Sequence, residues 1–338
     1  MATDKNEHLK KVLETNDISK VENFDRYVKK KNEVKEAMDS HYSIERASKS
    51  IDSGSYAKKT ANNTKFDIDV CTPFKNKMKE DDNGFFTLKD MFDDVYKYLR
   101  DEYSEDDNDL KKENVRKQKV SIGLKFIFDD GDELELDVVP GRERPNNGSY
   151  NDDSTDLTLY INPTKRTKKE IEDTKSSIKT NVKKHVSLLS GSGRTHERKV
   201  ARLLKVWKTE KKEKDGGKLI KSFMMELYTK EAFDNAESIP NGLWKKAKMV
   251  MEYIIDNIES KNLVDPANTG NIVSDSMSDS AKTDTRKSMQ TTIDEIDENS
   301  DKIKEHFPIN EEYDTSDDDD NKSSARTSAT VLGTNKFG

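Results

Sequence analysis

The feature that most constrains this chain is a short polar turn followed by a strand-like segment with two closely spaced carboxylates. Ser53-Gly54-Ser55-Tyr56 forms the turn, and Phe66-Asp67-Ile68-Asp69-Val70 contains the carboxylates. Side chains two residues apart in an extended strand point the same way, so Asp67 and Asp69 share one face. The apolar residues between and beside them take the other face, toward a core. The segment is therefore predicted to be a strand with an acidic side and a buried side.

The turn and the acidic strand suit a phosphate and a divalent cation. Gly54 lets the backbone approach a phosphate closely, and the Ser55 hydroxyl and nearby N–H groups can hydrogen-bond to it. Carboxylate oxygens placed side by side suit Mg²⁺, which keeps waters and substrate phosphates in its coordination shell. Each signal alone is weak, since 38% of the residues are charged and an acidic strand face is usually just solvated. Their order along the chain gives them weight.

A third carboxylate is predicted on a hairpin over residues 119–140. Apolar residues alternate with polar ones from Val120 to Phe128, which is typical of a half-buried strand, and Asp129–Asp132 makes a turn. On the return strand the leucines and valines point inward and the acids line the opposite face. Asp137 is the candidate because it lies farthest from the turn, whereas Glu133 and Glu135 are expected on the solvated part.

Together these motifs resemble those of the polymerase-β-like nucleotidyltransferases. The match is to the branch that holds oligoadenylate synthases, cyclic GMP–AMP synthase and the bacterial cGAS/DncV-like nucleotidyltransferases. Arg202-Leu203-Leu204-Lys205-Val206-Trp207-Lys208 resembles a helix of that branch, and Leu263-Val264-Asp265-Pro266-Ala267-Asn268 resembles a later segment. The resemblance spans residues 20–305 but leaves 141–195 poorly matched, so it assigns no base-selecting residue.

The resemblance implies an α+β fold and a role for each motif. A nucleotidyltransferase core sheet over 1–162 would be followed by a helical substrate-binding lobe over 163–309 and a disordered tail over 310–338. Two Mg²⁺ ions, for which Mn²⁺ can substitute, would be held by Asp67, Asp69 and Asp137. The donor triphosphate would contact Gly54, Ser55, Lys205 and Ser222.

The implied activity is synthesis of a cyclic di- or oligonucleotide from nucleoside triphosphates, with ATP among them. The product would activate a downstream effector in bacterial antiphage (CBASS) signalling. A linear, template-independent transferase acting on RNA or another acceptor shares the same motifs, although a net charge of −7 gives no bulk attraction to nucleic acid. A nucleotide-binding scaffold that has lost catalysis is the third reading, and the intact carboxylates argue against it.

Composition limits the organisation of the chain, its disulfides and its place in the cell. The chain has 338 residues, enough for two lobes, but only 31% are hydrophobic, so part must be tail or exposed loop. A single cysteine, Cys71, excludes an internal disulfide and is expected to be buried. The start lacks the apolar core of a signal peptide, and no stretch is apolar enough to span a membrane, which predicts a cytoplasmic protein.

Periodicity predicts the other elements. Charged helices are expected within 4–50, and a helix over 84–103 has Thr87 as its N-cap. A strand is expected at 157–161 and a polar helix at 165–186. Helices at 195–210, 219–232 and 243–259 should form a bundle, followed by one last helix that includes Ile293 and Phe307. On the first of these three, Arg198, Arg202 and Lys205 form a basic stripe, which is either a solvated face or the face from which Lys205 reaches a polyphosphate.

The end of the chain carries one further hypothesis. Beyond about residue 310 the sequence is rich in Asp, Ser and Thr and ends on Gly338. A lone terminal Gly is usually just a flexible end. Some bacterial members of the resembled branch are conjugated through a small C-terminal residue by a ubiquitin-transfer-like partner, which would make Gly338 a conjugation site.

Overall fold

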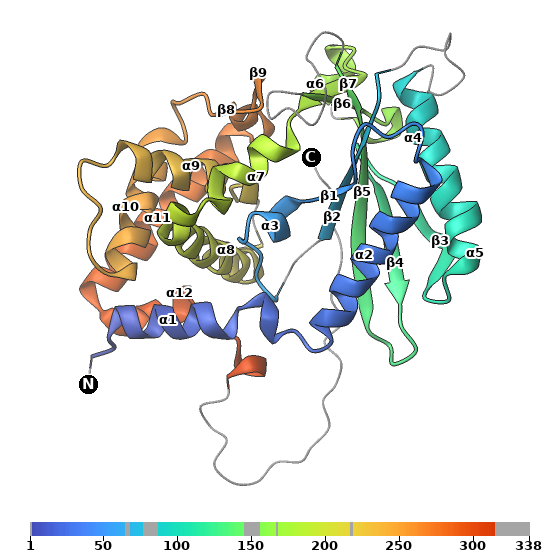
Figure 1. The fold of residues 1–338 in the computed structure, drawn as a ribbon. Coiled ribbons are helices and arrows are strands. Elements are labelled where there is room, and N and C mark those ends of the chain that lie inside the picture. The colour runs from blue at the N-terminus through green and yellow to red at the C-terminus, as the bar shows by residue number, and fades with distance from the viewer. Residues whose placement is uncertain are drawn as a thin grey trace. The chain divides into compact units, whose positions relative to one another are not determined.

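The computed structural model of the protein describes residues 2–64, 68–76, 87–144, 156–166, 168–216 and 219–314. These residues fall into two compact units (Figure 1). The sheet unit contains the described residues of 23–57 and 68–186, and the helical unit contains those of 2–22, 58–64 and 187–314. The units differ from the contiguous ranges expected from the sequence. The difference arises because the first helix and the segment after the Gly-Ser turn both pack with later helices.

One mixed sheet organises the sheet unit. Its path is β1-β2-β5-β4-β3, and β6 pairs with β5 and β7 with β6. The β2–β5 pair is parallel and the other pairs are antiparallel. The strands are β1 (Ile51–Ser53), β2 (Ile68–Phe74), β3 (Leu110–Lys117), β4 (Ile122–Ile127), β5 (Glu133–Glu143), β6 (Leu157–Tyr160) and β7 (Ser177–Thr180).

Helices α2 (Phe24–His41) and α4 (Leu88–Lys97) pack against this sheet (Figure 1). The N-terminus of α4 has a capping box, in which the Thr87 hydroxyl accepts from the N–H of Asp90 and the Asp90 carboxylate accepts from that of Thr87. This confirms the predicted cap. Short helices complete the unit: α3 (Gly54–Ala57), a π-helical turn (Tyr98–Tyr103), α5 (Ser104–Asp106) and α6 (Lys168–Glu172).

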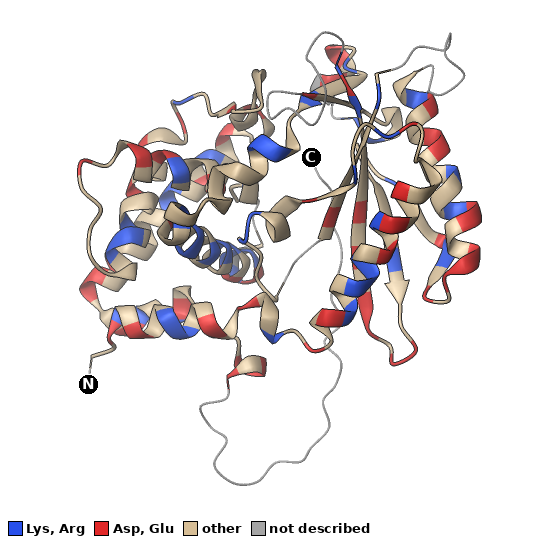
Figure 2. Cartoon of the chain, in the orientation of Figure 1, with Lys and Arg blue, Asp and Glu red and all other residues tan. Residues whose placement is uncertain are grey.

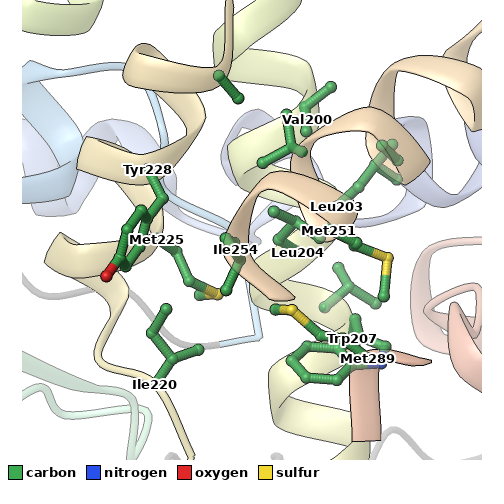
Figure 3. Close-up of a cluster of buried hydrophobic side chains, with 14 of the residues drawn as sticks. Val200, Leu203, Leu204, Trp207, Ile220, Met225, Tyr228, Met251, Ile254 and Met289 are labelled. Atoms are coloured by element: carbon green, nitrogen blue, oxygen red, sulfur yellow. The ribbon is translucent and has the colours of Figure 1, made fainter. Parts of the chain in front are cut away.

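The helical unit is built around one apolar core. Figure 3 shows side chains from several helices meeting there, and the Trp207 indole N–H donates to the Thr292 hydroxyl at 2.9 Å. The elements are α1 (Lys5–Thr15), α8 (Thr195–Asp215), α9 (Ser222–Asn235), α10 (Leu243–Asn257), β8 (Val264–Asp265), β9 (Asn268–Ile272), α11 (Asp279–Glu298) and α12 (Ile303–His306). The residues of α7 (Val182–Ser190) are divided between the two units after Val186.

Most predicted elements are confirmed, and two are wrong. The hairpin, the strand at 157–161 and the three bundle helices are present, and Cys71 is fully buried. The expected helix at 165–186 is instead α6, strand β7 and the start of α7. Thr174 adopts a left-handed φ of 52° that ends α6, and the following residues pair with β6. The single last helix expected to include Ile293 and Phe307 is two helices, α11 and α12, because Asn299 leaves the helical conformation after α11 and Phe307 follows the end of α12. Among the described residues, no helix is long and apolar enough to cross a membrane.

Candidate active site

Two of the predicted carboxylates lie side by side in the sheet unit. Asp69 on β2 and Asp137 on β5 are partners in the parallel β2–β5 register. Partners at the same level on neighbouring strands put their side chains on the same face, with the strands about 4.8 Å apart. Both residues are buried, with 7% and 8% of their surface exposed, whereas Glu135 on the same face is exposed. The structure therefore brings these two predicted carboxylates together on adjoining strands.

The Gly-Ser turn lies directly against Asp69. Ser53, the last residue of β1, is the register partner of Asp69, and Gly54 follows with a left-handed φ of 67°. A Cβ placed on Gly54 would lie 1.6 Å from Asp69 Oδ2. Both the backbone conformation and the space therefore require glycine. The half-buried Ser55 follows within α3, so β1, β2 and β5 bring the turn and the two carboxylates together.

Asp137 is oriented by the turn that connects β3 to β4. Gln118 Nε2 donates to Asp137 Oδ1 at 2.7 Å, and the Ser121 hydroxyl donates to Asp137 Oδ2 at 3.2 Å. Room for this comes from Gly123, since a Cβ there would lie 2.4 Å from Gln118 Nε2. The sequence reasoning missed Gln118 and Ser121. A glycine in the middle of a predicted strand was the available signal, because it often marks a close approach.

Helix α2 supports the Gly-Ser turn through contacts with the residues on either side of it. Lys31 and Lys35 each contact Asp52 at 2.8 Å, and Lys31 Nζ also lies 4.8 Å from the centre of the Tyr56 ring. Burial alone would raise the pKa of Asp52, but its hydrogen bonds and ion pairs with the two lysines lower it below its ordinary value. Asp52 and Tyr56 flank Gly54 and Ser55, so both ends of the turn are tied to α2. These contacts were not predicted.

The donor set fits a divalent cation as far as it is described. Two carboxylates in register provide hard oxygen ligands, and the Gly54 cradle leaves room beside Asp69 that a side chain would fill. Asp67, the third predicted ligand, lies outside the described residues. No group of three His, Cys, Asp or Glu side chains that could hold a metal occurs among the residues that are described.

Lys205 is held in a buried polar cluster of the helical unit. Its ammonium donates to Glu226 Oε1 at 2.7 Å, to the Thr60 carbonyl at 2.9 Å and to the Thr60 hydroxyl at 3.1 Å. An ammonium has three N–H donors, so these acceptors occupy all of them. The Glu226 carboxylate also accepts from Lys58 and from the Thr60 hydroxyl. A triphosphate contact from Lys205, as predicted, would have to replace one of these hydrogen bonds.

The cluster shifts the pKa of its acid and its base in the same direction. Burial alone would raise the pKa of Glu226, but the charges of Lys205 and Lys58 outweigh it and lower the pKa to about 2. The pKa of Lys205 is lowered because the cost of burying its ammonium exceeds the attraction of Glu226. Glu226 is thus a fixed negative charge shared between two ammonium groups.

Ser222, the other predicted triphosphate contact, begins α9. Lys208 Nζ lies 3.1 Å from the Ser222 hydroxyl, one helical turn along α8 from Lys205. The lysine that contacts Ser222 is therefore Lys208, to which the sequence analysis assigned no role. Lys and Arg residues recur along α8 (Figure 2).

The other basic residues of the α8 stripe are structural. Arg202 donates to the carbonyls of Leu13 and Asn16 and pairs with Asp17, which ties α8 to the end of α1. Arg198 donates to the carbonyls of Leu189 and Gly191, just before α8. The guanidinium groups of these two arginines are engaged with backbone carbonyls and do not form a purely solvated face.

The sheet, the Gly-Ser turn and the carboxylate pair define a class of fold. An α+β nucleotidyltransferase-type sheet with a bundle of C-terminal helices is the arrangement of the cGAS/DncV-like nucleotidyltransferases, the CD-NTases. No family model matches the sequence, and no curated protein matches it. The likeness lies in the structure.

Three solved structures show this likeness. E. coli MS115-1 CdnC with ATP superposes with a TM-score of 0.63 at 18% identity, covering 86% of this chain and 91% of CdnC. The Bradyrhizobium diazoefficiens CD-NTase CdnG in complex with GTP gives 0.62 at 12% identity, covering 89% and 96%. Vibrio cholerae DncV, a cyclic AMP–GMP synthase, gives 0.54 at 14% identity, covering 77% and 68%. The chain thus has the CD-NTase fold, at identities too low to carry over a substrate.

Proposed function

We propose that this protein is a Mg²⁺-dependent nucleotidyltransferase that makes a cyclic di- or oligonucleotide from nucleoside triphosphates. The observation that carries the proposal is the in-register pair of Asp69 and Asp137 with the Gly54 backbone against it. Structural neighbours solved with ATP and with GTP, and one that is a cyclic AMP–GMP synthase, support the substrate and product classes.

The residues take roles that follow from their chemistry. Asp67, Asp69 and Asp137 would hold two Mg²⁺ ions, which when bound activate a ribose hydroxyl and stabilise the leaving pyrophosphate. Gly54 and Ser55 would hold the donor triphosphate through backbone N–H groups and a hydroxyl. Gln118 and Ser121 fix the rotamer of Asp137, so its carboxylate keeps one direction.

The reaction is a displacement at the donor α-phosphorus. The ribose hydroxyl oxygen of the acceptor forms a new P–O bond, the bond to the bridging oxygen of the β-phosphate breaks, and pyrophosphate leaves. Asp137 is the candidate to accept the hydroxyl proton. Ser222 and a lysine of α8, Lys205 or Lys208, would stabilise charge on the leaving phosphates. A second displacement within the linear product would close the ring.

The test is incubation of the purified protein with all four nucleoside triphosphates and Mg²⁺ or Mn²⁺, followed by phosphatase treatment and mass spectrometry. Phosphatase-resistant material at the mass of a cyclic di- or trinucleotide is the expected result. Phosphatase-sensitive linear oligomers would instead identify the template-independent linear transferase. If Asp69→Asn makes as much product as the wild type, the role of the carboxylates is refuted.

The biological setting proposed is antiphage signalling in the cytoplasm, with the cyclic product activating an effector. Conjugation through Gly338, which lies outside the described residues, is proposed as a separate property of the chain. Co-expression with a candidate ubiquitin-transfer-like enzyme and intact-mass analysis tests it. We expect an adduct on the full chain and none on a chain that lacks Gly338. If no adduct depends on Gly338, the hypothesis is refuted.

A further inference from the structure

The turn that orients Asp137 is itself held by a residue from outside the β3–β4 hairpin. Asn162 lies just after strand β6, and only 7% of its surface is exposed. Its side-chain amide donates to the Gln118 carbonyl at 3.1 Å, and its backbone N–H donates to the Lys119 carbonyl at 2.8 Å. Asn162 therefore fixes two successive peptide groups of the turn.

Two further sets of contacts hold Asn162 and the turn in place. The Asn162 Oδ1 atom accepts from the backbone N–H of Thr164 at 3.2 Å and from the Thr164 hydroxyl at 3.1 Å, so the direction of its amide is set locally. Lys119 Nζ lies 2.8 Å from Glu170 Oε1 on α6, and both side chains are mostly buried. The turn is thus anchored to the segment that follows β6 by backbone and side-chain contacts together.

The anchor reaches the proposed active site through Gln118. The carbonyl of Gln118 accepts from Asn162, while its side-chain amide donates to Asp137 Oδ1 at 2.7 Å. The Gln118 N–H donates to the Ser121 carbonyl at 2.9 Å, which closes the turn and places the Ser121 hydroxyl 3.2 Å from Asp137 Oδ2. A shift of the Gln118 backbone therefore moves both groups that orient the carboxylate. Outer hydrogen-bonding partners of this kind set the direction in which a metal-binding carboxylate presents its oxygens.

We infer that Asn162 is a positioning residue for nucleotidyl transfer, which acts through Gln118 on the orientation of Asp137. The inference rests on the proposed function, and it assigns a role within 141–195, the part of the sequence that the family resemblance matches poorly. All three residues belong to the sheet unit, so the path from Asn162 to the carboxylate lies within one compact body. Loss of such an outer partner typically costs 10–100-fold in activity or metal affinity.

A double-mutant cycle on the full-length protein, with the four nucleoside triphosphates and Mg²⁺, tests this path. Asn162→Ala should lower kcat about tenfold and change KM less than about twofold, because the orientation of Asp137 matters to the reaction rather than to substrate binding. In the Gln118→Leu background the same substitution should have no further effect on kcat, since the path to Asp137 is already cut. Thr164→Val is the matched control from the same turn. The Thr164 N–H still holds the Asn162 amide in that variant, so kcat should stay within about twofold of the wild type.

An unchanged kcat in Asn162→Ala, or an equal loss of kcat in the wild-type and Gln118→Leu backgrounds, would overturn the inference. If Asn162→Ala does not fold, Asn162→Asp serves instead, because it lacks the amide N–H but keeps the acceptor for Thr164.

Hydrogen exchange measured by mass spectrometry provides a readout that needs no activity. The backbone amides of residues 117–124 should exchange about tenfold faster in Asn162→Ala than in the wild type or in Thr164→Val, because the turn has lost its anchor. Unchanged exchange would also overturn the inference. If the wild type makes no nucleotide product, the proposed function fails, whereas the exchange result still decides whether Asn162 holds the turn.

Discussion

The buried cluster around Glu226 makes the sharpest stability prediction. Replacing Glu226 by Gln keeps the shape of the side chain and removes its charge, which leaves Lys58 and Lys205 buried together without a carboxylate. Removing one partner of a buried ion pair costs about 3–5 kcal/mol. The pKa gives a similar figure: about 2 in the folded protein against an ordinary 4.5 corresponds to about 3 kcal/mol at neutral pH.

The assay is urea unfolding followed by tryptophan fluorescence. Both tryptophans of the chain, Trp207 and Trp244, are buried in the helical unit, so the signal reports on the unit that holds the cluster. Glu226→Gln should lower the free energy of unfolding by about 3 kcal/mol. Glu231→Gln on the same helix is the matched control. Its partner Lys261 lies 2.7 Å away in a partly exposed pair, so its loss should cost less than about 1 kcal/mol.

The pH dependence provides an independent check. Because the folded pKa of Glu226 is depressed, its contribution is present above 4.5 and is lost as the pH falls toward about 2. Other carboxylates also titrate in this window, so the difference between wild type and Glu226→Gln isolates the contribution of Glu226. That difference should shrink on acidification. A cost below about 1 kcal/mol at pH 7, or a difference that does not change with pH, would refute the buried-charge argument.

Three further predictions concern the sheet unit. Gly54→Ala should abolish product formation and destabilise the protein by about 1–3 kcal/mol, because its Cβ would overlap Asp69. Gly131→Ala is the control in both assays and should keep activity, because Gly131 also has a positive φ but no atom lies within 4 Å of a Cβ placed there. Asp69→Asn combined with Asp137→Asn should lower turnover in the nucleotide assay more than about a thousandfold, while the circular dichroism spectrum stays native. A smaller loss of turnover would contradict the metal site. Gln118→Leu should lower kcat about 10–100-fold with little change in unfolding midpoint; an unchanged kcat would mean that Asp137 needs no orienting donor.

The sheet side of the candidate site could be predicted because its signals are local. Alternation with a period of two assigns Asp69 and Asp137 to faces, and Gly54 with its serines marks the turn, all within short stretches of sequence. The parallel pairing that brings the two aspartates into register is not local, and the sequence did not predict it. Gln118 escaped prediction because its role depends on the register of β3, β4 and β5 and on the space above Gly123.

The residues that could not be predicted owe their position to long-range packing. Charges at 165–186 favour a helix, but an open edge of β6 recruits Ser177–Thr180 as a strand, and tertiary pairing overrides local preference. The α8 stripe shows the same limit. Its spacing predicts a basic face, yet Arg202 meets the carbonyls of α1 and Lys205 meets Glu226 and Thr60. Neither partner is near in sequence, so only the fold reveals that these cations are already engaged.

The engagement of Lys205 has a consequence for the reaction. Residues 58–64 belong to the helical unit, but in the chain they connect the Gly54–Ala57 turn to the strand that carries Asp69. Glu226 holds two residues of this connection, Lys58 and Thr60. Any change that loosens Glu226 therefore releases the chain a few residues from the proposed phosphate turn. Glu226→Gln should lower kcat at urea concentrations where the protein remains folded, whereas Glu231→Gln should not, so the same pair of variants separates a positioning role from a purely structural one.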